Sequence, residues 1–288
     1  MQRRRNDNGC QCKQHHLKFQ IKFQRKQSWD SVHPTFFWRL QKWPESVKRH
    51  QRASTPARQH ASIIYDEHLD IGSGHGELIE ILRTEELVKH SCACDYTADL
   101  MKLQDVKIQV ADLNQQALPF DDRSFNLVTC TEVIEHLEHY RETIREMYRV
   151  LKPGGTLVLT TPNVLNLKSR VRFFVYGFHN LFGPLHIRES ALHSTGGHIN
   201  PVSYFYLAHS LLDAGFENIT LDIDKKQGTS MFWLALFYLP IKAFAWLTTR
   251  KEKSKYRTID QHNEHHVKQI NSLATLTGRT IIVGCHKP

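Results

Sequence analysis

One stretch of this sequence restricts the fold more than any other, because it joins an apolar run to three alternating glycines and then to a second apolar run. The stretch is Leu69–Glu77, LDIGSGHGE, and LIEIL follows it. This pattern predicts a buried strand, a tight turn and a helix. The glycines allow left-handed backbone and leave no Cβ between the turn and a ligand, and the first N–H groups of the helix point into the same space. Glycine-rich turns also occur for packing alone, so other residues must show whether this one binds a cofactor.

Downstream of this turn, short apolar runs alternate with amphipathic segments. Ile144, Met147, Tyr148 and Leu151 recur at helical spacing, which predicts a helix over Tyr140–Leu151, and the KPGG motif that follows ends it. The alternation predicts an α/β fold with a mainly parallel sheet. The other predicted helices are Glu77–His90, Thr97–Leu103 and Ser203–Ala214, and the predicted strands are the one ending at Leu69–Ile71, then Ser91–Cys94, Val106–Val110, Phe125–Cys130, Thr156–Thr161, Asn218–Ile223 and Arg279–Cys285.

The net charge of +9 is concentrated at one end of the chain. Residues 1–60 hold 14 Lys and Arg against 3 Asp and Glu, whereas the rest holds 24 against 26. We expect a basic extension over residues 1–50, which contacts nucleic acid or anionic lipid or is simply solvated, with helix from about residue 34. The start has no apolar signal-like core, and the six cysteines are expected to be free thiols, which favours a cytoplasmic location.

Five short blocks, taken together, have the order and spacing of one known family. They are Leu69–Glu77, the acid Asp95, Ala111–Leu113, Leu118–Phe125 and Leu151–Gly155. Through them the sequence resembles class I S-adenosylmethionine (SAM)-dependent methyltransferases over roughly residues 61–288, with the domain expected to begin near residue 51. The resemblance implies a Rossmann-like, seven-stranded sheet, mostly parallel with an antiparallel last strand and helices on both faces, and SAM as cofactor. The alternative is an NAD-binding domain, but the LKPGG and LPF blocks have no role in the dinucleotide motif.

The resemblance places the SAM site at the carboxyl ends of the first strands, where ligands of open α/β sheets bind. Asp95 is expected to accept both ribose hydroxyls, and Asp112 the adenine amino group, with Leu113 against the ring. The glycine turn is expected near the methionine and ribose, with Asp70 anchoring the turn or the ammonium group. The expected SAM-binding residues are Asp70, Gly72, Ser73, Gly74, Gly76, Asp95, Tyr96, Asp112, Leu113 and Thr131.

The block after the fourth predicted strand, EVIEHL, contains two acids and a histidine. If it is helical, Glu132, Glu135 and His136 share one face, and such a set can bind a divalent cation such as Mg or Zn. The block is similar to that of O-methyltransferases of ubiquinone synthesis and of small-RNA 2′-O-methyltransferases, which implies a metal site completed by His198. In the alternative without metal, the acid–histidine pair shapes the pocket, and His136 or His198 is the catalytic base because imidazole titrates near neutrality.

Two apolar segments exceed the core pattern, residues 171–185 and residues 231–249. The second contains Pro240 and Lys242 and is at the lower length limit for a membrane span, so a transmembrane helix is not expected. Its two tryptophans and the basic run that follows suit an interfacial element on the inner face of an anionic membrane. The alternatives for both segments are an apolar lid or a dimer interface.

These features predict a SAM-dependent methyltransferase that methylates an oxygen of an apolar or lipid-linked small molecule or glycan. Two other classes remain open. An RNA 2′-O-methyltransferase would use the basic extension, but the rest of the chain is close to neutral and offers no aromatic and basic RNA platform. A non-catalytic protein that keeps the SAM fold as a scaffold would not need the glycine turn together with both acids.

Overall fold

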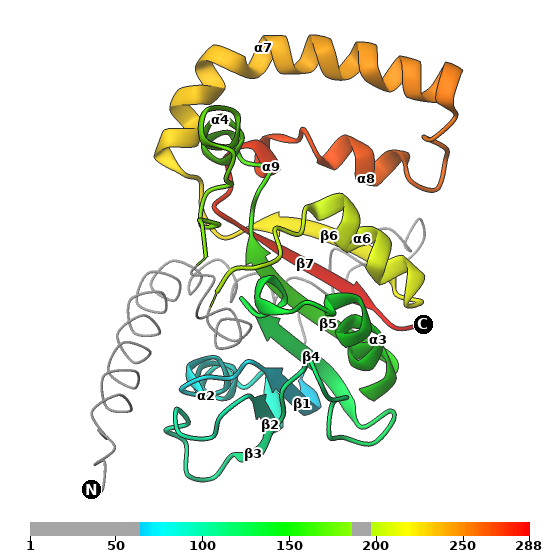
Figure 1. Cartoon of the computed structure of the whole chain (residues 1–288). Coiled ribbons are helices and arrows are strands. Elements are labelled where there is room, and N and C mark those ends of the chain that lie inside the picture. Colours follow the sequence, from blue (N-terminus) through cyan, green and yellow to red (C-terminus); the bar gives the residue numbers. More distant parts are fainter. Residues whose placement is uncertain (1–63, 186–196) are drawn as a thin grey trace, which may run out of the picture.

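The computed structural model describes residues 64–185 and 197–288, so the predictions for residues 1–50 lie outside the described residues. The strands within these ranges are β1 Tyr65–Ile71, β2 Val88–Asp95, β3 Lys107–Val110, β4 Phe125–Thr131, β5 Leu151–Pro162, β6 Glu217–Ile223 and β7 Thr280–His286. They form one sheet of seven strands in the order β3-β2-β1-β4-β5-β7-β6 (Figure 1). β7 is antiparallel to β5 and β6, and the other neighbours are parallel. The predicted fold class is confirmed.

Helices cover both faces of this sheet. In the described residues they are α2 Glu77–Thr84, α3 Tyr140–Val150, α4 Leu167–Tyr176, α6 Tyr204–Asp213, α7 Gly228–Lys251, α8 Glu264–Gln269 and α9 Leu273–Thr277, with short turns η1 Ile134–His136 and η3 Glu252–Tyr256. In β5, Leu157 and Leu159 pack with side chains of α3 and α6, whereas Val158 between them packs with side chains of α2. A strand that is buried on both sides is apolar on both sides, and β5 shows this pattern.

The strand order reverses between β1 and β4, which are neighbours although β2 and β3 lie between them in the chain. Ligands of open α/β sheets bind in the crevice at such a point. Ile71 pairs with Cys130, so the segments that follow β1 and β4 leave the same edge of the sheet side by side. The glycine turn and the EVIEHL block are therefore neighbours.

The first predicted helix is shorter than expected, because α2 ends at Thr84 rather than at His90. Glu86 adopts a left-handed φ of 53°, the Leu87 N–H donates to the Leu82 oxygen over 2.9 Å, and the Glu86 N–H donates to the Arg83 oxygen over 3.0 Å. These bonds form a Schellman end with a glutamate at the position that glycine usually occupies. Without a glycine there, the sequence contained no stop signal.

The predicted helix over Thr97–Leu103 is wrong, because this segment is a series of turns. Met101 and Leu103 instead lie over the glycine turn, where a Cβ added to Gly76 would lie 2.9 Å from each side chain. The Lys102 N–H also donates to the His75 oxygen over 3.3 Å. Contacts with the turn therefore replace the hydrogen bonds of a helix.

The apolar segment over residues 231–249 lies inside one helix, α7, at the top of the molecule in Figure 1. α7 packs against α4 and α9, and its most apolar stretch is not buried. Among the described residues, it is the one helix that is long and apolar enough to cross a membrane. The other apolar segment forms the end of α4 and the turn after it.

Candidate functional site

The glycine turn leaves β1 in left-handed backbone and contacts the segment after β4. Gly72 has a φ of 71°, and its N–H donates to the Cys94 oxygen of β2 over 2.8 Å. A Cβ added to Gly72 would lie 2.2 Å from Cγ2 of Val133. Glycine is therefore required here both by the backbone angle and by the close approach of Val133. Sequence reasoning did not single out Val133.

Asp95, the acid at the end of β2, holds this turn through its carboxylate. Its Oδ2 accepts a hydrogen bond from the Gly74 N–H, and its Oδ1 accepts one from the Tyr96 N–H, each over 2.8 Å. Asp95 is buried, whereas the Tyr96 side chain is exposed. Each carboxylate oxygen has two lone pairs, so Asp95 can bind the turn and two ligand hydroxyls at the same time.

Asp70 is the penultimate residue of β1 and contacts the neighbouring strand β4. It is buried, and its Oδ1 accepts a hydrogen bond from Thr129 Oγ1 over 2.7 Å. The same Thr129 hydroxyl lies 2.8 Å from Nε2 of the buried His68, whose Nδ1 is 3.1 Å from Ser91 Oγ. Because the Thr129 hydrogen is given to Asp70, His68 donates from Nε2. Burial lowers the pKa of His68 to about 3, so the ring is neutral. Sequence reasoning missed His68, which precedes the apolar run in which the strand was recognised.

Two predicted cofactor-binding residues present buried hydroxyl groups. Ser73 Oγ and Thr131 Oγ1 have no hydrogen-bond partner among the described residues. Ser73 lies in the glycine turn, and Thr131 is the last residue of β4. A buried hydroxyl without a partner is costly, so these two atoms fit a site in which a polar ligand supplies the missing bonds. This observation supports the SAM site on grounds independent of the resemblance.

Asp112 follows the last residue of β3 by two positions and lies near Asp95, since the Ala111 N–H donates to the Asp95 backbone oxygen over 3.0 Å. Its Oδ1 accepts a hydrogen bond from the Asn114 N–H over 3.0 Å, and its Oδ2 accepts one from Gln115 Nε2 over 2.9 Å. Leu113 packs at the edge of the main core. The two acids thus end neighbouring strands, as the sequence predicts, and both stabilise the turns that follow them.

The EVIEHL block does not form a helix from its first acid. Glu132 has a left-handed φ of 54°, and η1 begins two residues later. The Thr160 hydroxyl donates to Glu132 Oε1 over 3.3 Å. The expectation of one helical face with Glu132, Glu135 and His136 is therefore wrong, because the chain turns before the helix begins.

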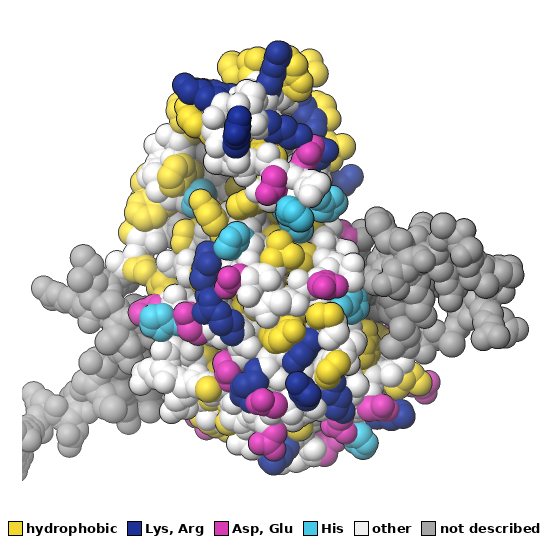
Figure 2. Space-filling view, turned by 90° about the vertical axis from the view of Figure 1, so that its right-hand side faces the viewer, with side chains coloured by type: hydrophobic (Ala, Val, Ile, Leu, Met, Phe, Trp, Pro, Cys, Tyr) yellow, Lys and Arg dark blue, Asp and Glu magenta, His cyan; other side chains and the backbone are white. Residues whose placement is uncertain are grey.

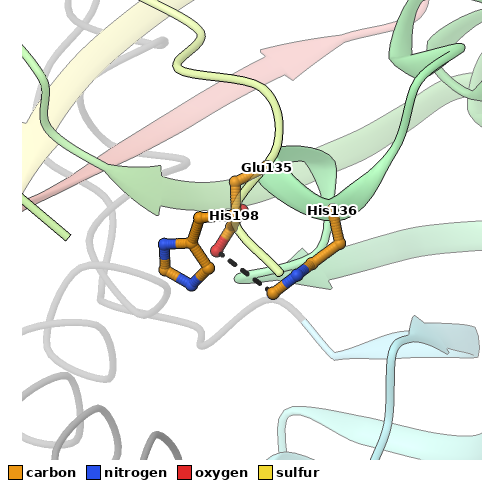
Figure 3. A group of neighbouring side chains, drawn as sticks. All are labelled: Glu135, His136 and His198. Carbon is orange, nitrogen blue, oxygen red and sulfur yellow. Dashed lines mark ion pairs between the residues drawn. The ribbon is translucent and has the colours of Figure 1, made fainter. Parts of the chain in front are cut away.

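Glu135, His136 and His198 come together instead (Figure 3). One ligand atom from each lies within 4.8 Å of the others, and the two imidazole rings meet edge to face at 4.8 Å. The two members of η1 face His198, which belongs to the segment before α6. That segment is fixed by the N–H groups of Ile199 and Asn200, which both donate to the Glu135 backbone oxygen over 3.0 Å.

Two atoms of this cluster are buried without a hydrogen-bond partner in residues 64–185 and 197–288, Glu135 Oε1 and His198 Nδ1. Burial and the neighbouring Glu132 hold the pKa of Glu135 well above its usual range, and burial together with His136 lowers the pKa of His198 to about 3. His198 is therefore neutral and does not titrate near neutrality as the sequence suggested. His136 Nδ1 is 2.9 Å from the Gly197 oxygen and donates to it, which leaves Nε2 as the ligand atom. A carboxylate and two imidazoles fit a divalent cation, which would satisfy both buried atoms.

An apolar wall closes one side of the cluster. The ring of Phe182, which is buried, lies 5.2 Å from the ring of His198. Its neighbour His179 stacks on Phe173 of α4 at 4.5 Å, and its ring nitrogen Nδ1 lies 3.3 Å from Ser169 Oγ. The chain from α4 to Phe182 therefore links an exposed apolar surface to the cluster. The sequence showed that this segment is apolar but not that it touches His198.

Comparisons with known proteins give consistent results. A family model described as "methyltransferase domain" matches residues 38–221. Among curated proteins, a demethylmenaquinone methyltransferase of Lactiplantibacillus plantarum is 31% identical over 189 residues, which cover 59% of this chain and 78% of that protein. Another, from Listeria welshimeri, is 30% identical over 168 residues, 52% of this chain and 70% of that one. A solved Thermotoga maritima structure, a SAM-dependent methyltransferase described as a possible histamine N-methyltransferase, has a TM-score of 0.49 and 14% identity and covers 95% of this chain and 99% of its own.

Proposed function

Because this chain belongs to the methyltransferase-domain family and is a SAM-dependent methyltransferase, we propose that it methylates a hydroxyl oxygen of an apolar, lipid-carried acceptor. One observation carries the proposal: the polar cluster of Glu135, His136 and His198 lies against the apolar Phe182, and the EVIEHL block that supplies two of its members contacts the glycine turn through Val133. A hydroxyl group on an apolar molecule fits such a place.

The names of the relatives support the lipid-carried class of acceptor, though not the acceptor atom. Both curated proteins described above are named for demethylmenaquinone, a lipid quinone. The wall formed by Phe182 and α4 supports the same class, since small-molecule sites combine apolar walls with a few polar groups that orient the ligand. The RNA alternative was supported by the basic extension, which lies outside the described residues, and by the EVIEHL block, which suits either acceptor class.

The chemistry of the transfer assigns separate tasks to the two halves of the site. When bound, SAM supplies a methyl group on a sulfonium, which is a strong electrophile. The glycine turn and Asp95 hold the cofactor in place, and the cluster side holds the acceptor, so that binding supplies most of the catalysis through orientation. The acceptor oxygen forms a bond to the methyl carbon, the carbon–sulfur bond breaks, and the sulfur keeps the electron pair. The hydroxyl proton leaves to the cluster of Glu135, His136 and His198.

The same three residues would hold a divalent cation, and two imidazole ligands favour Zn over Mg. Such an ion would lower the pKa of the acceptor hydroxyl. Without an ion, Glu135 in its ionised form is the base of the cluster, and burial makes it more basic than an ordinary carboxylate because burial raises its pKa. The metal-bound and the metal-free form of the site both need Glu135, the first as a ligand of the ion and the second as the base. A chelator lowers activity only in the metal-bound form.

A single experiment tests acceptor class and metal dependence together. The chain is incubated with methyl-labelled SAM and with cell extracts divided into an organic lipid phase, an aqueous small-molecule phase and RNA, each with and without EDTA. We expect label in the organic phase, and about a hundredfold less with Glu135→Gln, a loss within the range for a general base. Label in RNA or only in the aqueous phase contradicts the proposed acceptor class. Labelling that EDTA leaves unchanged assigns the cluster to proton transfer alone.

A further inference from the structure

The outer side of α7 and the end of α4 form one apolar surface, which we term the α4–α7 surface. Its exposed members are Phe173, Phe174, Val175 and Tyr176 on α4 and Phe232, Leu236, Leu239, Phe244, Trp246 and Leu247 on α7. The exposed fraction reaches 89% at Phe174 and 75% at Leu239. The two helices pack against each other, and Figure 2 shows hydrophobic side chains gathered at this end of the molecule. A patch of this extent is characteristic of an interaction site.

α7 is apolar on the side that faces the protein as well as on the side that faces solvent. Trp233 and Phe237 are half-buried toward the protein and stack on each other at 5.6 Å. The outward row between Phe232 and Leu247 contains one charged residue, Lys242, whose ammonium lies 5.8 Å from the Tyr238 ring. A helix that is apolar all round is normally found in a protein core or in a lipid phase. α7 is not in a core.

Positive charge gathers at one end of this surface. Residues 250–257 hold five Lys and Arg against one Glu, and lysines and arginines cluster at this end in Figure 2. Arg250 lies over the Trp246 ring at 5.8 Å, and Lys251 and Lys255 lie over the Tyr256 ring at 5.4 Å. Cations with aromatic rings at the margin of an apolar surface are typical of the boundary between headgroups and acyl chains, and the charges favour anionic lipid.

Chain topology decides whether α7 crosses a bilayer or lies in its plane. Its 24 residues extend about 36 Å, which would suffice for an apolar layer of about 30 Å. However, the chain leaves and re-enters the domain at one place, since the Gln227 N–H donates to the Thr277 oxygen over 2.8 Å. The return path over residues 252–277 is rich in charged and polar residues. α8 on this path is fixed to α6 through Tyr204 Oη and His266 Nδ1, 3.0 Å apart, so both ends of α7 are on the same side.

We propose that the α4–α7 surface docks on an anionic lipid bilayer with α7 in the plane of the membrane, entering one leaflet without crossing. This orientation places the end of α4 in the lipid and the path through Phe173, His179 and Phe182 between the lipid and His198. The docking is independent of the proposed function. Only its use, the entry of a lipid-carried acceptor from the leaflet, rests on that function.

Vesicle flotation tests the docking with the full chain. The vesicles are pure phosphatidylcholine or an equal mixture of phosphatidylcholine and phosphatidylglycerol. We expect the wild type to float with the anionic vesicles and Leu239→Glu/Phe244→Glu to lose at least about tenfold in bound fraction, since charged residues in the acyl region are strongly disfavoured. Tyr206→Glu/Leu212→Glu, at exposed positions of α6, is the matched control and is expected to float like the wild type.

Two further measurements separate the alternatives. Arg250→Gln/Lys251→Gln/Lys255→Gln is expected to lower affinity for anionic vesicles by about fivefold per charge without affecting binding to neutral ones, and alkaline carbonate is expected to release the bound wild type.

The docking is overturned by a wild type that floats with neither vesicle, by Leu239→Glu/Phe244→Glu floating like the wild type, or by resistance to carbonate, which indicates a span. Light scattering that shows a dimer without vesicle binding assigns the surface to a second copy. Unchanged SAM affinity in each variant shows that the fold is intact, and absent methyl transfer with normal flotation rejects the proposed function alone.

Discussion

The Gly74 N–H donates to Asp95 Oδ2 over 2.8 Å, so the acid at the end of β2 holds the glycine turn at the end of β1. Asp95 was expected to act on the cofactor alone. Its second oxygen also accepts from the Tyr96 N–H, which orients the carboxylate before any ligand arrives. The same side chain therefore shapes the turn and prepares the cofactor site, and its loss affects both.

Asp95→Asn is expected to weaken SAM binding by about tenfold to a hundredfold, because hydrogen bonds to charged groups contribute roughly 1.5–3 kcal/mol. The amide that replaces one carboxylate oxygen also faces a backbone N–H, so the free energy of unfolding is expected to fall by about 1 kcal/mol or more. Titration calorimetry with SAM and chemical denaturation measure the two effects. The matched control is Asp99→Asn, an exposed acid on the following loop. An unchanged affinity in Asp95→Asn means that this residue is not part of the cofactor site.

Gly72→Ala is expected to destabilise the protein by about 3 kcal/mol, because a left-handed φ and a steric clash act together. Gly177→Ala isolates the first cost, since Gly177 has a φ of 77° and no other described atom would lie within 4 Å of its Cβ. Val133→Ala removes the atom 2.2 Å away and leaves Val133 Cβ at 3.6 Å. The loss of unfolding free energy in the double variant Gly72→Ala/Val133→Ala is therefore expected to be smaller than the sum of the losses in the two single variants, by about 1 kcal/mol or more. Additive free energies in denaturant unfolding argue against this contact.

The sheet could be predicted because its strands are signalled locally. Apolar runs bounded by turn residues located all the strands of the described sheet, and the acids at the ends of these runs, Asp95 in β2 and Asp112 just after β3, were recognised. Elements whose limits depend on tertiary contacts could not be predicted in this way. Glu86 ends α2 in a backbone conformation that sequence patterns assign to glycine. Thr97–Leu103 is not helical because Met101 and Leu103 cover Gly76.

In the candidate site as well, the residue types could be predicted from the sequence, but their arrangement in space could not. The residue types of Glu135, His136 and His198 were recognised from the sequence, but their meeting depends on the backbone turn at Glu132, which no pattern signals. The Thr160 hydroxyl donates to Glu132, which lies near Glu135 but is not a member of the cluster. Burial then sets the protonation states, so a histidine expected to titrate near neutrality is neutral instead.

Stability is expected to fall in acid because His68 is buried as a neutral ring. The pKa of His68 is lowered from 6.5 to about 3 on folding, so its contribution is fully present above about pH 6.5 and is lost as the pH falls toward 3. At about pH 5 the expected loss is about 2 kcal/mol. The glutamine of His68→Gln cannot take up the proton. Between about pH 7 and about pH 5, the unfolding free energy of this variant is therefore expected to fall by about 2 kcal/mol less than that of the wild type. The exposed His90→Gln serves as control, and equal pH slopes in all three proteins contradict the assignment.

Zinc affinity is expected to respond differently to substitution of the two acids of the EVIEHL block, because only Glu135 lies in the cluster. Burial and Glu132 raise the pKa of Glu135, so a proton must leave before the carboxylate can bind the ion, and zinc affinity is expected to rise with pH by up to about tenfold per pH unit. Glu135→Gln removes this dependence and weakens binding. Glu132→Gln is expected to act in the opposite direction above about pH 7, where Glu132 is ionised, since removing its charge lowers the pKa of Glu135 and strengthens binding. Calorimetry in buffers of different ionisation enthalpy counts the released proton. Equal weakening by both substitutions would place Glu132 among the ligands and contradict the geometry.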